Sequence, residues 1–335
     1  MDGRTDPDRL DASLEHSKLL GRRIRAGAPQ ALGIPTEEFA LDALRRGDMA
    51  EARQQLDYAV EEASRVYFIF STWLRALLDY GATHVDDIDA ELERLAGVIG
   101  SPPPVVDPQG VGAVEAERAA ESLSSGDPPT FEEAFAALRR VQRDVHDAQA
   151  DWCWGLLTVF RDALGEDRME EVFRATMSPW LSERYAALAS MTPEESFRLT
   201  IEGMRAHHCG PNRSGHIDVR DEPDRWVMSF DPCGTGGRMR RGDPLADPTP
   251  RTEAPYNFAV TERAHDWSWG EEGVCIYCAH CAVVNEILPI EQTGAPMRVV
   301  DYPRDPGDSC RWTIYKSPDL VPAEAYERVG KVKPE

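Results

Sequence analysis

The chain has 335 residues, of which 41% are hydrophobic and 29% charged, so it is long enough for one large or two ordinary globular domains. Its net charge of −22 disfavours nucleic-acid phosphate and anionic membrane as partners, because both would repel the protein. No basic patch interrupts this surplus of acidic residues. We therefore expect a small-molecule substrate or ligand, no nucleic acid and no membrane, with a homodimer left open.

The N-terminal stretch Met1 to Ala26 lacks the basic start, apolar run and small-residue cleavage site of a secretory signal. The most apolar stretch, Val66 to Leu78, is too short to span a bilayer and contains Arg75. Seven cysteines, three of them in one short run, fit metal or thiol chemistry in a reducing compartment better than a disulfide framework. These features predict a cytoplasmic protein.

The N-terminal part of the chain has the pattern of a helical layer. Residues 1–33 mix both charge signs with Gly and Pro and are expected to form a flexible arm. Residues 34–100 form a helical region in which apolar side chains recur at helical spacing. Its expected helices are Thr36 to Gly47, Asp48 to Tyr80 with Gly81 as the end, and Asp86 to Val98.

Residues 101–129 are rich in Pro, Gly and Ser around a short Ala/Glu run and are predicted to be a linker. Residues 130–208 form a second helical region that packs on the C-terminal domain. Its expected helices are Thr130 to Leu164, Arg168 to about Leu188 with a bend at Pro179, and Pro193 to His207. Thr192 and Glu195 have the spacing of a capping box at the start of the last one.

Residues 209–335 switch to alternating apolar and polar residues, which indicates strands. Two antiparallel hairpins and a short helix are expected: His216–Arg220 with Trp226–Phe230, Met297–Tyr302 with Cys310–Tyr315, and Cys278–Ile287. The predicted fold class is α+β, with a mostly helical N-terminal layer followed by a small antiparallel sheet and a cysteine-bearing helix.

The strongest chemical signal is the run Cys275-Ile-Tyr-Cys278-Ala-His280-Cys281. Two-residue gaps between thiols allow them to converge on one ion where a turn enters a helix. Cys233 follows the first hairpin and Cys310 opens the last strand, so both are expected at the same end of the sheet. The preferred interpretation is zinc bound by Cys233, Cys278, Cys281 and Cys310, with Cys275 or His280 as a substitute. An iron–sulfur cluster is one alternative, because three close cysteines and a distant fourth suit one. The other is that several of these cysteines are partly buried thiols that bind nothing.

The second signal is the loop Asp231-Pro-Cys-Gly-Thr-Gly-Gly-Arg238, which follows a predicted strand. The amides of Gly234, Gly236 and Gly237 and the side chain of Arg238 form a candidate cradle for a carboxylate or phosphate. A glycine-rich turn without chemistry is an equally good interpretation. The loop has neither the Walker nor the dinucleotide-binding spacing.

Two histidine-bearing segments are further candidates. His207-His208-Cys209 lies at a helix C-terminus, where a histidine can act as a cap and a second one as an acid or base. His265 precedes an aspartate and the pair Trp267 and Trp269. The two tryptophans either wall an apolar pocket beside the thiols or simply pack on the sheet. Cys153 lies between two tryptophans in a helical apolar stripe and is expected to be a small buried hydrophobe.

Several C-terminal segments resemble the tail of the L-2-amino-thiazoline-4-carboxylate hydrolase-like family. They are Tyr277-Cys278 through Glu286-Ile287-Leu288, Gly294-Ala295-Pro296 and Cys310-Arg311-Trp312. The resemblance covers less than a third of the chain. It implies a cysteine-dependent hydrolase of small-ring, C–N or C–S substrates, with Cys278 and Cys310 as the matching positions. A looser similarity is to small-ligand sensor domains of the 4-vinyl-reductase type, which combine an α/β body with metal-binding cysteines.

Together these features favour a zinc-dependent enzyme, a hydrolase or lyase, acting on a small anionic molecule. In this hypothesis Cys233, His280 and His265 are catalytic, and Arg238, the loop glycines, Trp267 and Trp269 bind substrate. One alternative is a small-molecule sensor with a structural zinc, and another is an iron–sulfur redox protein.

Overall fold

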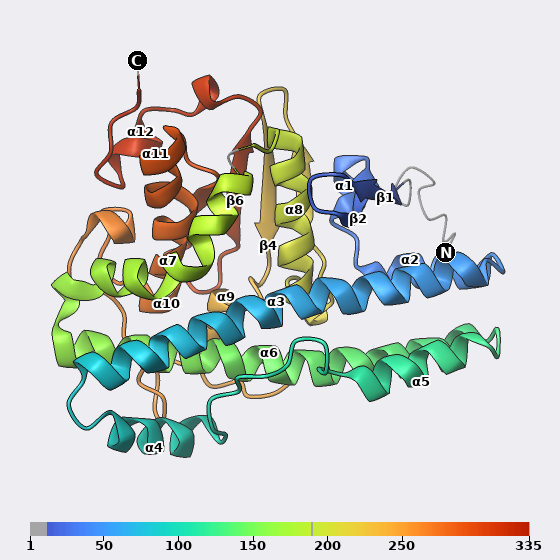
Figure 1. The fold of residues 1–335 in the computed structure, drawn as a ribbon, viewed down its shortest axis with the longest axis horizontal. Coiled ribbons are helices and arrows are strands. Elements are labelled where there is room, and N and C mark those ends of the chain that lie inside the picture. The colour runs from blue at the N-terminus through green and yellow to red at the C-terminus, as the bar shows by residue number, and fades with distance from the viewer. Residues whose placement is uncertain (1–11, 189, 335) are drawn as a thin grey trace.

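The computed structural model describes residues 12–188 and 190–334. Its N-terminal part is helical, as expected (Figure 1). The helices of this part are α1 (Pro29–Leu32), α2 (Thr36–Arg45), α3 (Met49–His84), α4 (Ile88–Ile99), α5 (Ala113–Leu123), α6 (Pro128–Leu164), α7 (Met169–Leu188) and α8 (Pro193–Ala206).

Two long helices, α3 and α6, lie side by side and run in the same direction across the molecule (Figure 1). The Tyr67 hydroxyl of α3 donates to the Gln142 carbonyl of α6 over 2.9 Å. Further along both helices, the rings of Tyr80 and Phe160 meet edge to face, with centroids 5.5 Å apart. The apolar stripes of the two helices therefore face each other along their lengths.

The helix α3 begins where the sequence predicts and ends later. The Asp48 side chain caps it by accepting from the Glu51 amide over 3.0 Å. Gly81 does not end the helix, which continues to His84. A Cβ at Gly81 would lie 3.0 Å from the Ile88 side chain and 3.2 Å from that of Phe160. This glycine therefore permits close packing.

Two segments expected to be loose are ordered in the structure. Residues 12–27 of the predicted arm form a hairpin of β1 (Ala12–Ser17) and β2 (Arg22–Gly27), whereas residues 1–11 lie outside the described residues. Arg22 of this hairpin forms a buried ion pair with Glu202 of α8. Within the predicted linker, α5 buries Ala119 and Leu123 in a cluster with α2, α3 and α6. Because these two segments are rich in charged and small residues, their sequence does not reveal the tertiary contacts that order them.

The C-terminal part contains a four-stranded antiparallel sheet in which the two predicted hairpins pair with each other. The strands are β3 (Asp218–Asp221), β4 (Arg225–Phe230), β5 (Val299–Asp301) and β6 (Cys310–Tyr315), in the order β3-β4-β6-β5. Phe230 at the end of β4 lies opposite Cys310 at the start of β6. The α+β fold class is confirmed, and this register brings the loop after β4 next to Cys310.

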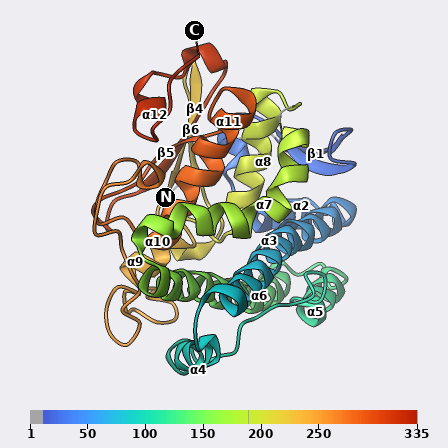
Figure 2. The same cartoon turned by 60° about the vertical axis from the view of Figure 1, so that its left-hand side comes forward.

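Helices cover the apolar face of this sheet, as Figure 2 shows for α8 and α11. Phe197 of α8 stacks on Trp226 of β4, with ring centroids 4.7 Å apart. The cysteine-bearing helix is longer than predicted, because three consecutive helical segments extend from Ile276 to Thr293. These are α10 (Ile276–Ala282), the π-helical η4 (Val283–Ile287) and α11 (Leu288–Thr293).

The remaining elements are short: α9 (Gly236–Arg241), α12 (Glu324–Glu327), η1 (Glu166–Arg168), η2 (Pro211–Arg213), η3 (Asp266–Ser268) and η5 (Pro318–Leu320). Among the described residues, no helix has the length and apolar character needed to cross a membrane.

Candidate functional site

Four cysteines from three chain segments line one cavity of about 80 Å³, which we call the thiol cavity. They come from the loop after β4, from α10 and from the start of β6, and they are Cys233, Cys278, Cys281 and Cys310. Aromatic side chains and histidines complete much of the wall: His207, Trp269, Tyr277, His280, Tyr302 and Trp312. The sheet and α10 thus bring together thiols that are far apart in the chain, with 77 positions between Cys233 and Cys310.

The loop that carries Cys233 is held by its own backbone and by its neighbours. The Arg238 amide donates to the Cys233 carbonyl over 2.9 Å, and the Gly234 amide donates to the Cys209 sulfur over 3.4 Å. The Gly210 amide donates to the Pro232 carbonyl over 2.9 Å. These contacts fix the position at which the Cys233 side chain enters the cavity.

The glycines of this loop allow close packing against neighbouring atoms. A Cβ on Gly234 would lie 1.5 Å from the His207 carbonyl oxygen, and one on Gly236 would lie 2.2 Å from the Cys278 sulfur. Gly236 and Gly237 line the thiol cavity, whereas Gly234 does not. The expected anion cradle is therefore replaced by a tight approach of backbone to sulfur, which only glycine permits.

On α10, Cys278 and Cys281 are three positions apart, so both side chains lie on the face that borders the cavity. Cys275 precedes the helix and caps it, because its sulfur accepts from the Cys278 amide over 3.2 Å. Cys275 is fully buried and does not line the cavity. Cys275 therefore caps the start of α10 and is not one of the four cavity thiols.

His280 lines the cavity beside Cys281, and its Nε2 atom lies 3.7 Å from the Cys281 sulfur. The other ring nitrogen, Nδ1, contacts the Tyr277 carbonyl oxygen. Burial lowers the pKa of His280 to about 4, so the imidazole is neutral at pH 7. A neutral imidazole at this position can accept a proton or a hydrogen bond from a molecule in the cavity.

The four cavity thiols differ in their electrostatic surroundings. The Cys209 thiol, the Thr235 hydroxyl and the amides of Thr235 and Gly237 hydrogen-bond to the Cys233 sulfur and lower its pKa to about 5. Burial, followed by the neighbouring cavity thiols, raises the pKa of Cys281 and of Cys310 well above the usual value. Cys233 is therefore the thiol with the most donors around its sulfur.

Cys209 and Cys153 occupy different surroundings. Cys209 is not among the metal ligands that the sequence predicts, but the structure places it directly behind Cys233, where it is fully buried. Cys153 is also fully buried, in the main hydrophobic core, and does not line the cavity. No disulfide joins any of the seven cysteines, all of which fall within the described part of the chain.

The four cavity thiols are the residues that the sequence predicts as ligands of one zinc ion. Among residues 12–188 and 190–334, no three or more His, Cys, Asp or Glu side chains are arranged to hold a single metal ion. A zinc ion needs four ligand atoms at about 2.0 to 2.3 Å from one centre. As these thiols are placed, they do not form the single-ion site that the sequence predicts.

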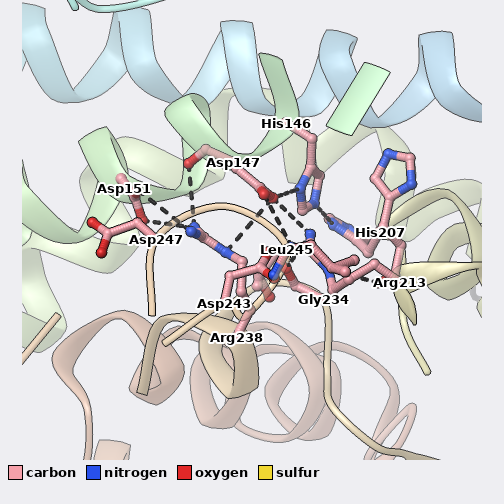
Figure 3. A network of polar contacts seen from close by, with 12 residues as sticks. His146, Asp147, Asp151, His207, Arg213, Gly234, Arg238, Asp243, Leu245 and Asp247 are labelled. Carbon is pink, nitrogen blue, oxygen red and sulfur yellow. Dashed lines mark hydrogen bonds and ion pairs between the residues drawn. The ribbon is translucent and has the colours of Figure 1, made fainter. Parts of the chain in front are cut away.

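Arg238 differs from its expected role, because its guanidinium lies outside the thiol cavity. It is 2% exposed and donates to the Asp151 carboxylate of α6 over 2.6 Å (Figure 3). Two residues later, Arg240 does line the cavity, with its guanidinium 4.5 Å from the centre of the Tyr302 ring. Arg240 is therefore the cationic side chain available to a group in the cavity.

A buried polar network behind the loop, which we call the Asp147 network, was not found from the sequence (Figure 3). Arg213 makes two hydrogen bonds to the Asp147 carboxylate, of 2.7 and 3.0 Å, and contacts Asp243. It also donates to the Gly234 carbonyl over 3.1 Å. Burial alone would raise the pKa of Asp147, but Arg238, His146 and Arg213 hold it well below the usual range. The network therefore anchors the loop that carries Cys233.

A chain of hydrogen bonds connects this network to the thiol cavity (Figure 3). His146 Nδ1 lies 2.8 Å from Asp147 Oδ1, and His146 Nε2 lies 3.0 Å from His207 Nδ1. His207 lines the cavity. The one sequence signal for this network is Asp147 and Asp151, spaced by one helical turn within the buried face of α6.

The segment around His265 is divided between two places. Trp269 lines the thiol cavity, and its indole donates to Glu286 over 2.8 Å. His265 is absent from the cavity wall; its Nε2 lies 2.7 Å from Glu166 and its ring stacks on Trp267. The catalytic role expected for His265 and the wall role expected for Trp267 therefore do not fit their positions.

The chain matches no protein-family model, no curated protein and no solved structure. The resemblance of its C-terminal segments to the thiazoline-carboxylate hydrolase-like family stays a prediction.

Proposed function

We propose that this protein is an iron–sulfur redox protein whose cluster is held by Cys233, Cys278, Cys281 and Cys310. The observation that carries the proposal is that these four thiols face one cavity from three separate chain segments. Four cysteine thiolates are the usual ligand set of [2Fe–2S] and [4Fe–4S] clusters.

We prefer a cluster to a single zinc ion because the four thiols line a cavity and form no single-ion site among the described residues. A zinc ion requires all four sulfurs about 2.3 Å from one point. In a [4Fe–4S] cluster each iron takes one cysteine, and inorganic sulfides complete its coordination, so the four cysteines stand around the cluster. Thiols distributed over the wall of one cavity are compatible with the second arrangement.

Simple core packing is a weaker explanation for the same residues. A buried cysteine that serves only as a small hydrophobe packs against its neighbours, as Cys153 does at 0% exposure. Four thiols turned toward a shared cavity do not fill space in this way.

The remaining wall of the cavity suits an anionic cluster. Arg240 supplies a positive charge that offsets the charge of four thiolates. The amides of Thr235 and Gly237 and the Thr235 hydroxyl donate to the Cys233 sulfur, and such bonds tune the reduction potential of a cluster. In this proposal the protein transfers electrons to or from a small molecule near the cluster.

The test is to purify the protein without oxygen and to measure iron, acid-labile sulfide and zinc per chain. We expect a brown protein with iron and sulfide in equal amounts, and an electron paramagnetic resonance signal in one oxidation state. Colourless protein with one zinc per chain would overturn the proposal in favour of a zinc centre. Protein with no bound metal would overturn both metal interpretations.

Single Cys→Ser variants identify the ligands. Variants at the four cavity cysteines should lose most of the iron, while Cys153→Ala serves as the control outside the cavity. Cys275→Ser should retain iron, because Cys275 caps the helix and does not line the cavity. If Cys153→Ala lost as much iron as the cavity variants, general destabilisation would explain the loss and the assignment would fail.

A further inference from the structure

A second cavity, of about 160 Å³, lies between the helical layer and the C-terminal part, and we call it the interlayer cavity. Helices α3, α7, α8 and α10 contribute its walls, together with η4 and β6. It shares part of its wall with the thiol cavity: Met204, His207, Tyr277, His280, Cys281 and Trp312. A molecule bound here would therefore lie next to Cys281.

Most of the interlayer cavity is apolar and aromatic. Phe70 and Trp73 of α3 face Tyr277 and His280 of α10, and the rings of Trp73 and His280 are 5.0 Å apart. For scale, a dry apolar cavity of about 150 Å³ binds benzene. The interlayer cavity is thus the right size for a single aromatic ring.

Asn285 of η4 adds a hydrogen-bond donor without a partner. Its side-chain oxygen accepts from Arg298 over 2.8 Å, and because arginine only donates, the oxygen must face Arg298. The Nδ2 atom finds no hydrogen-bond partner among the described residues, although Asn285 is 1% exposed. A buried amide donor left unpaired costs about 1–3 kcal/mol, which a bound acceptor would recover.

The sequence explains why the helix widens at this residue. Pro289 has no amide hydrogen to donate to the Asn285 carbonyl four residues earlier. That carbonyl instead accepts from the amides of Met297 (2.9 Å) and Arg298 (3.2 Å), and the helix takes a π-helical turn over Val283–Ile287. Such turns occur often at functional sites.

A glycine of α8 leaves space in the wall of the cavity. Gly203 lies within α8 and lines the cavity, and a Cβ placed on it would meet no atom within 4 Å. A glycine in a helix costs about 0.8–1.0 kcal/mol relative to alanine. The space beside α8 is therefore not required for packing of the helix.

The charged groups of the wall favour an acceptor over a cation. Glu62 pairs with Arg205 and Glu202 pairs with Arg22, so both carboxylates in the wall are already neutralised. Arg298, which donates to the Asn285 side-chain oxygen, also lines the cavity and donates to Thr200 over 2.7 Å. With its carboxylates already paired, the wall thus offers the Asn285 amide as a donor to a ligand.

We propose that the interlayer cavity binds a single-ring aromatic molecule whose carboxylate or carbonyl oxygen accepts a hydrogen bond from Asn285 Nδ2. The idea that the bound molecule is a substrate of the cluster rests on the proposed function. The binding site itself does not, because binding and iron content are measured separately.

The experiment measures binding of benzoate, acetophenone and toluene to the full-length protein by ligand-observed NMR. Benzoate and acetophenone carry an acceptor, charged or neutral, and toluene carries none. We expect both acceptors to bind about tenfold or more tightly than toluene, the gain of about one buried hydrogen bond. The order of benzoate and acetophenone shows whether the natural acceptor is a carboxylate or a carbonyl.

Two variants locate the binding. Asn285→Asp keeps the oxygen that faces Arg298 and replaces the donor by an acceptor, so it should weaken benzoate and acetophenone about tenfold and leave toluene unchanged. Gly203→Leu should fill the cavity and abolish binding of all three probes. Its control is Gly97→Leu on the exposed face of α4, where a Cβ also meets no atom within 4 Å.

Equal affinity for the three probes, or unchanged affinity in Asn285→Asp, would overturn the inference. If Gly203→Leu does not fold, as judged by its thermal melting, the Asn285→Asp result decides alone. Metal-free protein that still binds benzoate through Asn285 would refute the cluster and leave the binding site standing. Iron-containing protein that binds no probe would refute the binding site and leave the cluster standing.

Discussion

The Asp147 network and the thiol cavity are neighbouring polar regions, but their buried groups are satisfied in different ways. In the network each carboxylate has a guanidinium partner, with Arg213 held by Asp147 and Arg238 by Asp151. In the cavity, four cysteines face a shared space. The carboxylates of the network are thus paired within the protein, whereas the four cavity cysteines form no disulfide.

One loop, which carries Cys233 and Gly236, contacts both regions. Arg213 of the network donates to the Gly234 carbonyl, and the next residue but one, Gly236, lies against the Cys278 sulfur. This ion-paired network thus holds the loop whose thiol faces the cavity. Groups that must keep a fixed position around a cofactor or ligand need this kind of support.

The largest effect should come from breaking the network. Asp147→Ala leaves Arg213 and Arg238 buried, at 4% and 2% exposure, without one of their carboxylates. Removing one partner of a buried ion pair costs about 3–5 kcal/mol, because the other charge remains buried. We expect a loss of that size in the free energy of unfolding, measured by urea denaturation.

The matched control for this variant is Asp167→Ala. Asp167 pairs with Arg263 at the surface, where the two side chains are 72% and 59% exposed. An exposed ion pair contributes about 0–1 kcal/mol. Equal losses in the two variants would show that the network does not carry the stability assigned to it.

The next largest effect is expected from Gly236→Ala, which would change the position of the loop relative to the Cys278 thiol. Gly236→Ala would place a Cβ 2.2 Å from the Cys278 sulfur, so either the loop or Cys278 must move. Overpacking of this kind costs about 1–3 kcal/mol. We expect that loss in urea denaturation, together with less iron per chain than in the unmodified protein.

Gly97→Ala is the comparison for Gly236→Ala. Its Cβ meets no atom within 4 Å, and alanine favours the helix, so α4 should gain about 0.5–1 kcal/mol. Normal iron content in Gly236→Ala would mean that the Cys278 sulfur does not bind the cluster from its present position.

The secondary structure of this protein could be predicted well where local chemistry decides it. The capping box of Thr192 and Glu195 is present at the start of α8, and both predicted hairpins exist. Pairing between the hairpins, which places Phe230 opposite Cys310, joins residues 80 positions apart. Register across that separation depends on tertiary packing, which the local pattern does not encode.

The candidate site was harder to predict, and the arginines show why. Arg238 follows the glycines directly and was expected to hold an anion, yet its partner Asp151 comes from a helix 87 positions earlier. Arg240, two positions further on, faces the cavity. A sequence pattern can place an arginine near a loop, but the distant carboxylate determines which arginine is already neutralised.

The smallest effect concerns pH and a histidine at the edge of the network. His208 is buried, its Nε2 atom has no hydrogen-bond partner among the described residues, and burial holds its pKa well below 6.5. His146 and Arg213 lower this pKa further, while Asp147 acts in the opposite direction. The native protein therefore keeps His208 neutral at a pH where the unfolded chain, with a pKa of about 6.5, becomes protonated.

The sign of the pH effect follows from proton uptake. Below about pH 6.5 the unfolded state binds one more proton at this residue, so stability falls as the pH decreases, and above it the residue has no effect. His208→Asn removes the group and tolerates the backbone φ of 52°. Between pH 6.5 and 5.5 we expect the decline in unfolding free energy to become shallower by up to about 1.4 kcal/mol per pH unit. Identical slopes in the unmodified protein and in His208→Asn would show that folding does not change the proton affinity of His208.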